Sequence, residues 1–473
     1  MNTLWVVVLV LFVYKIVLLS IGFAYRDKGG DDAGFFLGDR SLGPWFTALS
    51  SAAGSSSAWT LLGVSGFAYT HGLSAVWIIP GSVGAFFINW YLVGPKLRQE
   101  ATREQALTLT DFLAGQASGT WNKACRYAAS LIVLCSLLVY VASQYQGAGK
   151  LFEATFAMDP VLSIVVSALI IWIYSLTGGF LAVSATDTLQ GLVMAACALL
   201  LPIVALIAVG GPGALAEGIA AVPEPSFGSF TRDMELMAAV GFIGSLVGIS
   251  LGGPGQPHVV NRFMAARDED TIRIGRRIAL TWACFVFAGM ILLGWCGRVL
   301  GSQLADNETI LFHLASELLP PILAGVVLAA VLSATMSTAD SQLLVAASSV
   351  THDLPGERRS KNAPRIALTL VSLAAVGLAV FGDRAIFSKV LFAWSALGAA
   401  FGPLLLVRLH RGKVRPAFAF AAMVVGFSLG VVFYLIPGTK GTIVERVLPF
   451  VIALLIAFFG AEKTGTSPPS HSE

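Results

Sequence analysis

Charged residues are scarce in this sequence: aspartate, glutamate, lysine and arginine make up 12% of its 473 residues. A water-soluble domain carries roughly twice that fraction, so the chain has too little polar surface to cover a soluble globule. Apolar residues account for 56% of the chain, and the mean hydropathy is +0.79. The composition therefore predicts an integral membrane protein. The net charge of +3 gives no indication of a nucleic-acid partner.

Sequence motifs typical of pumps and enzymes are also missing. The chain has no P-loop, no paired cysteine and histidine spacing for a metal, and no G-x-S-x-G. Its five cysteines are scattered and odd in number, which argues against disulfides or a zinc site; they are Cys125, Cys135, Cys197, Cys284 and Cys296. These absences favour secondary transport over ATP-driven pumping or membrane-bound catalysis, and we expect no enzymatic activity and no prosthetic group.

Long apolar runs, bounded by charge, proline and glycine, predict an all-α protein with thirteen transmembrane helices. Their approximate ranges are 4–25, 44–69, 72–95, 125–149, 160–179, 187–209, 235–256, 275–300, 320–350, 364–381, 387–408, 416–436 and 443–460. The first run is too long for a signal peptide and has no basic segment before it, which indicates an uncleaved helix. We expect one transmembrane domain over residues 1–460 and a disordered cytoplasmic tail over 461–473.

The distribution of positive charge predicts the orientation in the membrane. Of the 30 lysines and arginines, 22 lie in loops after odd-numbered spans, 7 lie on the other side, and Lys15 lies inside the first span. Positive residues concentrate in cytoplasmic loops. The N-terminus is therefore expected outside and the C-terminus in the cytoplasm.

Two small, hydroxyl-rich patches interrupt otherwise apolar spans. The second span contains LSSAAGSSSAWT from Leu49 to Thr60, which indicates either a tight helix crossing or a broken helix whose freed carbonyls bind a cation. The ninth span contains LSATMSTADSQLL, in which Ala334, Ser337 and Thr338 share one helical face. Hydroxyl and carbonyl oxygens are hard ligands, suited to a small alkali cation.

Four ionisable residues lie in or beside the spans, where burial of charge is expensive. Asp187 opens the predicted sixth helix, as an N-terminal cap or as part of an ion site. Asp340 lies near the ninth-span patch, but two positions beyond Thr338 it points in a different direction. It is either part of the ion site, or a cap or ion-pair partner near the cytoplasmic end of the helix. Lys15 has a structural or snorkelling role, and His258 is a packed or interfacial histidine.

Six stretches, in order and spread over most of the chain, resemble the sodium/solute symporters, most closely their bacterial proline-transporting members. They are GDRSLGPWFTALS (38–50), ALTLTDF (106–112), LFEATFAM (151–158), GGFLAVSATDTLQ (178–190), GQPHVVNRFMAA (255–266) and MSTADSQLLVAASS (336–349). The resemblance implies a LeuT-type core of two inverted five-helix repeats with broken helices, here about 44–209 and 235–408.

The resemblance also implies site residues. Sodium, the co-transported ion, would bind the carbonyls of Ala53, Ser56 and Ala334 and the hydroxyls of Ser337 and Thr338, with Asp187 matching an aspartate implicated in ion coupling. The solute would lie among Ser55, Ser57, Trp59, Tyr140, Ser143, Gln144, Ile249 and Gly253.

This chain departs from the proline-transporting pattern at two places. Ser55 stands where those relatives carry an aspartate, and Ile249 and Gly253 stand where they carry aromatic residues. We therefore expect a pocket that is wider at Gly253, with weak proline transport and a preference for a larger amino acid or related carboxylate.

The predicted function is sodium-coupled symport of a small organic solute, most simply an amino acid, across a bacterial inner membrane. The expected partners are the solute, sodium and the lipid bilayer. Alternatives are the same fold carrying a sugar, urea or a short-chain acid, a proton-driven variant, or a transporter-like membrane sensor of solute.

Overall fold

The computed structural model describes residues 3–25, 34, 37–115, 119–176, 179–354 and 362–462. All elements within these ranges are helical. Eleven of the described helices are long and apolar enough to cross a membrane. The predicted all-α membrane protein is therefore confirmed. Of the predicted tail, all but residues 461 and 462 lies outside the described residues.

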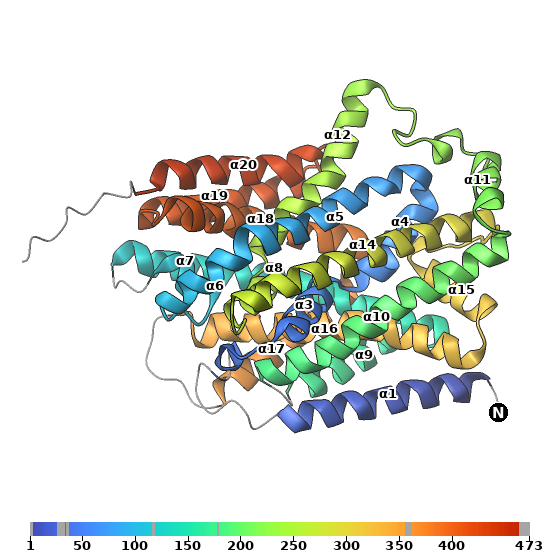
Figure 1. Ribbon diagram of the computed structural model, residues 1–473, viewed down its shortest axis with the longest axis horizontal. Coiled ribbons are helices and arrows are strands. Elements are labelled where there is room, and N and C mark those ends of the chain that lie inside the picture. Colours follow the sequence, from blue (N-terminus) through green and yellow to red (C-terminus); the bar gives the residue numbers. More distant parts are fainter. Residues whose placement is uncertain are drawn as a thin grey trace, which may run out of the picture.

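The principal helices run roughly parallel in one bundle (Figure 1). They are α1 (Thr3–Tyr25), α3 (Pro44–Ser55), α4 (Val64–His71), α5 (Ile78–Phe87), α8 (Thr120–Phe156), α9 (Pro160–Ser175), α10 (Phe180–Val209), α12 (Leu236–Val247), α14 (Glu269–Val299), α16 (Pro321–Thr351), α17 (Ala363–Phe381), α18 (Ile386–Arg411), α19 (Pro416–Leu435) and α20 (Ile443–Gly460). Shorter helices are α6 (Gly94–Arg103), α7 (Leu109–Ala114), α11 (Pro212–Ala221), α13 (Pro257–Met264) and α15 (Ile310–Leu318).

The thirteen predicted spans each match a helix or a pair of half-helices. Two of them share one helical run of 45 residues, Trp59–Arg103. Gly72 divides this run at a φ of 59°, and a Cβ there would lie 2.0 Å from the Phe227 carbonyl oxygen, so only glycine fits. Helix α9, with 16 residues, is short for a span. Helix α1 begins and α20 ends at opposite ends of the bundle, as an odd number of crossings requires (Figure 1).

The first membrane helix of each predicted repeat is broken. Helix α3 ends at Ser55, Ser56 has non-helical backbone angles (φ −112°, ψ 88°), and the chain resumes with a π-helical turn before α4. Helix α12 passes into a 3₁₀ segment, Gly248–Gly255, and Gln256 separates it from α13. The broken-helix interpretation of the second span is confirmed.

A loop joins three helices at the end of the bundle where α1 begins. Glu308 accepts a hydrogen bond from Lys150 of α8 (2.6 Å) and further bonds from the amides of Ile386 and Phe387 (3.2 and 2.9 Å) at the start of α18. The neighbouring Asn307 donates to the Gly66 carbonyl of α4 (2.9 Å). A buried carboxylate thus satisfies amides that have no partner within the helix.

Candidate cation and solute sites

The break after α3 faces the middle of α16. The Ser337 and Thr338 hydroxyls of α16 lie 3.2 and 3.4 Å from the Ala53 carbonyl oxygen, and the Ser337 hydroxyl lies 3.4 Å from the Ala334 carbonyl. All three residues with hydroxyls here, Ser56 included, are fully buried. The structure therefore brings the two hydroxyl-rich patches of the sequence together. These neutral, hard oxygens form the candidate cation site.

Asp187 lies beside this site, in an ion pair. Its Oδ2 atom is 2.7 Å from the Arg262 guanidinium of α13 and accepts a hydrogen bond from Ser50 of α3 (2.9 Å). Arg262 also donates to Ser50 and to Ser341 of α16. Asp187 and Arg262 are at most 2% exposed. The pair joins α3, α10, α13 and α16. Because α10 begins at Phe180, Asp187 lies inside this helix, and the capping alternative for Asp187 is wrong.

Sequence reasoning missed Arg262, which the charge count assigned to a cytoplasmic loop. The signal available was its place in GQPHVVNRFMAA, where it is surrounded by apolar residues. Asp340 is buried as well, and its Oδ1 atom accepts from the Ser341 amide. Because α16 continues to Thr351, Asp340 does not cap the helix end.

The polar solute-site residues meet where the first broken helix contacts α8. Gln144 accepts a hydrogen bond from the Ala58 amide (3.0 Å), and Ser57 accepts one from the Trp59 amide (3.2 Å). Tyr140 of α8 is fully buried beside Ser57. Its ring stands edge-on to His258 at 6.1 Å, which confirms His258 as a packed histidine.

The remaining residues of the predicted solute site are placed differently. Trp59 packs between Phe287 and Phe387, each at 5.8 Å between ring centres. Ser55 and Ser143 donate to carbonyls of their own helices, at Ala52 and Val139.

The predicted widening of the pocket at Gly253 is wrong. A Cβ at Gly253 would lie 3.0 Å from the Ala85 Cβ and 3.2 Å from its carbonyl oxygen, so this position packs against α5 and leaves no open space. Ile249 packs toward Gly81 of the same helix. Both positions belong to a helix–helix contact, and the argument for a larger solute loses its basis.

Pockets of unequal size lie on the two sides of the central residues. The one beyond α4 measures about 370 Å³ and is lined by α4, α12 and α18, together with residues of α19, α20 and the loop between them. The one on the side of α13 measures about 20 Å³, and Thr108, Arg262 and Ser341 are among its lining residues. Phe387, which packs on Trp59, is one of the lining residues of the larger pocket.

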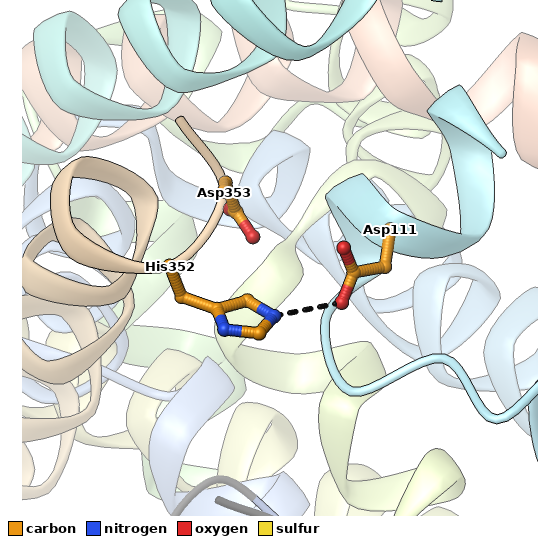
Figure 2. A group of neighbouring side chains, drawn as sticks. All are labelled: Asp111, His352 and Asp353. Atoms are coloured by element: carbon orange, nitrogen blue, oxygen red, sulfur yellow. Dashed lines mark hydrogen bonds and ion pairs between the residues drawn. The ribbon is translucent and has the colours of Figure 1, made fainter. Parts of the chain in front are cut away.

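A second polar cluster contains Asp111, His352 and Asp353 (Figure 2). Asp111 of α7 is 3.0 Å from the His352 Nε2 atom and 3.1 Å from Arg126, and Thr108 donates to Asp353 (2.7 Å). One ligand atom each from Asp111, His352 and Asp353 lie within 4.8 Å of one another, close enough to share a metal ion. However, Arg126 already pairs with Asp111, and Thr108 already donates to Asp353. We therefore interpret these five residues as a polar contact that holds α7 against the end of α16, and we call it the clasp.

The two carboxylates of this clasp differ in proton affinity. Burial raises the pKa of Asp353 to about 6, and the negative charge of Asp111 adds to the shift. Burial would also raise the pKa of Asp111, but the hydrogen bond and charge of His352 and the charge of Arg126 lower it below its usual range.

Broken helices that face a central hydroxyl-bearing helix are typical of secondary transporters. The chain belongs to the sodium:solute symporter family, whose profile matches residues 35–426. It is therefore a sodium-coupled symporter of a small organic solute.

Similar proteins agree with this assignment. The chain is 35% identical over 435 residues to a sodium/proline symporter of Salmonella typhimurium, covering 88% of this chain and 85% of that one. It is 32% identical over 447 residues to a sodium/proline symporter of Staphylococcus aureus, covering 91% and 86%.

Solved structures share the LeuT-type fold. A Na⁺-coupled sialic acid symporter has a TM-score of 0.77 at 18% identity, covering 97% of this chain and 99% of that one. MhsT, in complex with L-phenylalanine, has a TM-score of 0.57 at 15% identity, covering 88% and 98%. The expected LeuT-like core is thus confirmed.

The buried ion pair gives a first prediction. Arg262→Met leaves the Asp187 carboxylate buried without its cation, which should cost about 3–5 kcal/mol of stability. Arg262→Met with Asp187→Asn should recover much of this loss, and the midpoint of thermal unfolding in detergent measures both. The control is Arg267→Met, which breaks an exposed ion pair with Asp268 and should leave the midpoint unchanged. Equal destabilisation in the single and double variants would contradict the pairing.

The clasp gives a second prediction. Because the pKa of Asp353 is raised from 3.8 to about 6, the folded protein loses stability as the pH rises through this window, by up to about 3 kcal/mol. Asp353→Asn removes the buried charge and should raise the unfolding midpoint at pH 7.5, with roughly half the gain at pH 5. Asp233→Asn, in an exposed loop, is the control. A gain that does not depend on pH would be inconsistent with this assignment.

Proposed function

We propose that the chain is a sodium/proline symporter. Two sodium/proline symporters are 32% and 35% identical to it over about nine-tenths of its length. The feature that argued for a different solute, an open space at Gly253, is absent from the structure. A symporter of this class needs no enzymatic step, and none is proposed.

In this proposal sodium binds between α3 and α16. Its ligands are the carbonyls of Ala53, Ser56 and Ala334 and the hydroxyls of Ser337 and Thr338. The observation that carries the proposal is the convergence of both hydroxyls on the Ala53 carbonyl. Asp187 acts indirectly, since its ion pair with Arg262 fixes α10 and α13 against α3.

The solute binds on the other side of the helix break, near Ser57, Trp59, Tyr140 and Gln144. Trp59 and Tyr140 supply aromatic surface for the ring of proline, and aromatic contacts contribute roughly 0.5–1.5 kcal/mol each. The Gln144 amide nitrogen and the Trp59 indole nitrogen are buried without a hydrogen-bond partner among the described residues. In this proposal these two donors bind the solute carboxylate.

The proposed arrangement in the membrane follows the charge distribution. The two inverted repeats cover about 44–209 and 235–408, the N-terminus lies outside and the C-terminus lies in the cytoplasm of a bacterial cell. The larger pocket, beyond α4, then opens outward. The short helices α6 and α7 lie at the cytoplasmic end, together with α13.

Uptake of labelled proline into proteoliposomes tests the function directly. Accumulation driven by an inward sodium gradient, and lost when potassium replaces sodium, is the expected result. A panel of other labelled amino acids, offered as competitors, tests the solute. Sodium-driven uptake of a different amino acid without proline transport would overturn the solute assignment and leave the coupling intact.

The cation site gives a third prediction. Ser337→Ala with Thr338→Ala removes two ligands and should raise the sodium concentration for half-maximal uptake at least about tenfold, equivalent to 1.4 kcal/mol. Some transport should remain, because three backbone carbonyls are unaffected. Thr335→Ala, whose hydroxyl bonds within its own helix (2.9 Å), is the matched control. Unchanged sodium dependence in the double variant would show that the site is elsewhere.

The orientation gives a fourth prediction. In a variant without the five native cysteines, Gly438→Cys should react with an impermeant maleimide added to intact cells. Lys413→Cys should react only after the membrane is opened. Both positions are exposed and lie at opposite ends of α19. The reverse labelling pattern would invert the proposed topology.

A further inference from the structure

Lys15 is the single charged residue of α1, a helix that is mostly exposed on the outside of the bundle, with Val7, Leu11 and Leu18 buried against it. Only 17% of its most apolar stretch is buried, and its other residues are apolar or uncharged. The Lys15 side chain turns inward, toward α16. Its ammonium contacts the sulfur of Met336 and lies 6.0 Å from the centre of the Tyr174 ring. A lysine that only avoided lipid would extend toward the membrane surface, so the inward direction indicates a partner.

That partner is Asp340. Met336 and Asp340 are four residues apart on α16 and therefore share a face. Lys15, which contacts Met336, therefore approaches the face of α16 that carries Asp340, and the two residues have opposite formal charges, although they form no direct ion pair. Asp340 is 1% exposed, and the adjacent Ser341 accepts a hydrogen bond from Arg262, the ion-pair partner of Asp187. The middle of α16 is thus surrounded by two cations and two carboxylates, whose formal charges cancel.

This balance bears on how many ions the protein takes up. One oxygen of each carboxylate, Asp187 Oδ1 and Asp340 Oδ2, is buried without a hydrogen-bond partner among the described residues. Without Lys15, the remaining three charges sum to −1. A single uncompensated charge attracts a sodium ion 8 Å away by about 2 kcal/mol at an effective dielectric constant of about 20. Such a centre would attract a further cation.

We propose that Lys15 is a tethered counter-cation that takes the place of a second sodium ion beside Asp340. Sodium then binds only at the neutral oxygens between α3 and α16, one ion per protein. This inference rests on the proposed sodium site. Helix α1 then takes part in ion coupling, because its Lys15 places a positive charge beside α16.

Equilibrium binding of ²²Na⁺ to the purified full chain in detergent, at pH 8 and without solute, tests the proposal. The unmodified protein should bind one ion at saturation. Lys15→Met should bind two, and Lys15→Met with Asp340→Asn should return to one. Lys15→Arg keeps the charge and should bind one. Asp340→Asn alone leaves an excess positive charge and should weaken sodium affinity about tenfold.

Each outcome has one meaning. Two ions on the unmodified protein, or one ion on Lys15→Met, would overturn the role of Lys15. If Lys15→Met does not fold, the Asp340→Asn variant decides, since unchanged sodium affinity there would also overturn it. An unmodified protein that binds no sodium would refute the sodium site itself, and a failure to transport proline would not affect the binding count.

Discussion

The structure depends on one constraint: backbone that leaves the helical conformation inside a membrane must find hydrogen-bonding partners in the protein. The chain leaves the helix at Ser56 and Ser57. Ser337 and Thr338 reach the Ala53 carbonyl on one side of this break, and Gln144 accepts from the Ala58 amide on the other. The packing of α8 and α16 against the first broken helix follows from that need. The same exposed carbonyls make the break suitable for a cation.

The role of the two polar patches as candidate cation-binding segments could be predicted, because clustered hydroxyls are costly in an apolar span unless they have a partner. The i, i+3, i+4 spacing of Ala334, Ser337 and Thr338 also gave their common face, since α16 is a regular helix through this region. That the patches face each other did not follow from the residues. It required the family resemblance, because long-range contacts between helices leave no local signal.

The misplacement of Gly253 has a different cause. The prediction took positions 249 and 253 from the pattern of the proline-transporting relatives, and this segment is a 3₁₀ helix, with about 3.0 residues per turn where an α-helix has 3.6. The direction of each side chain therefore shifts along the segment. Arg262 was overlooked because the count of positive charge treats every residue between two spans as solvated. A short buried helix, α13, follows the break and carries Arg262 into the protein.

The loop that carries Asn307 and Glu308 has a mechanical consequence. It holds α4, α8 and α18 through the Gly66 carbonyl, Lys150 and the first amides of α18. Helix α4 directly follows the π-helical turn that begins at Trp59. A displacement of this loop would therefore move α4 and, with it, Trp59 in the solute site. In the proposed topology this loop lies on the outer side of the membrane, where its position affects the buried centre. A reagent that clamps it from outside the cell would then slow turnover without entering either pocket.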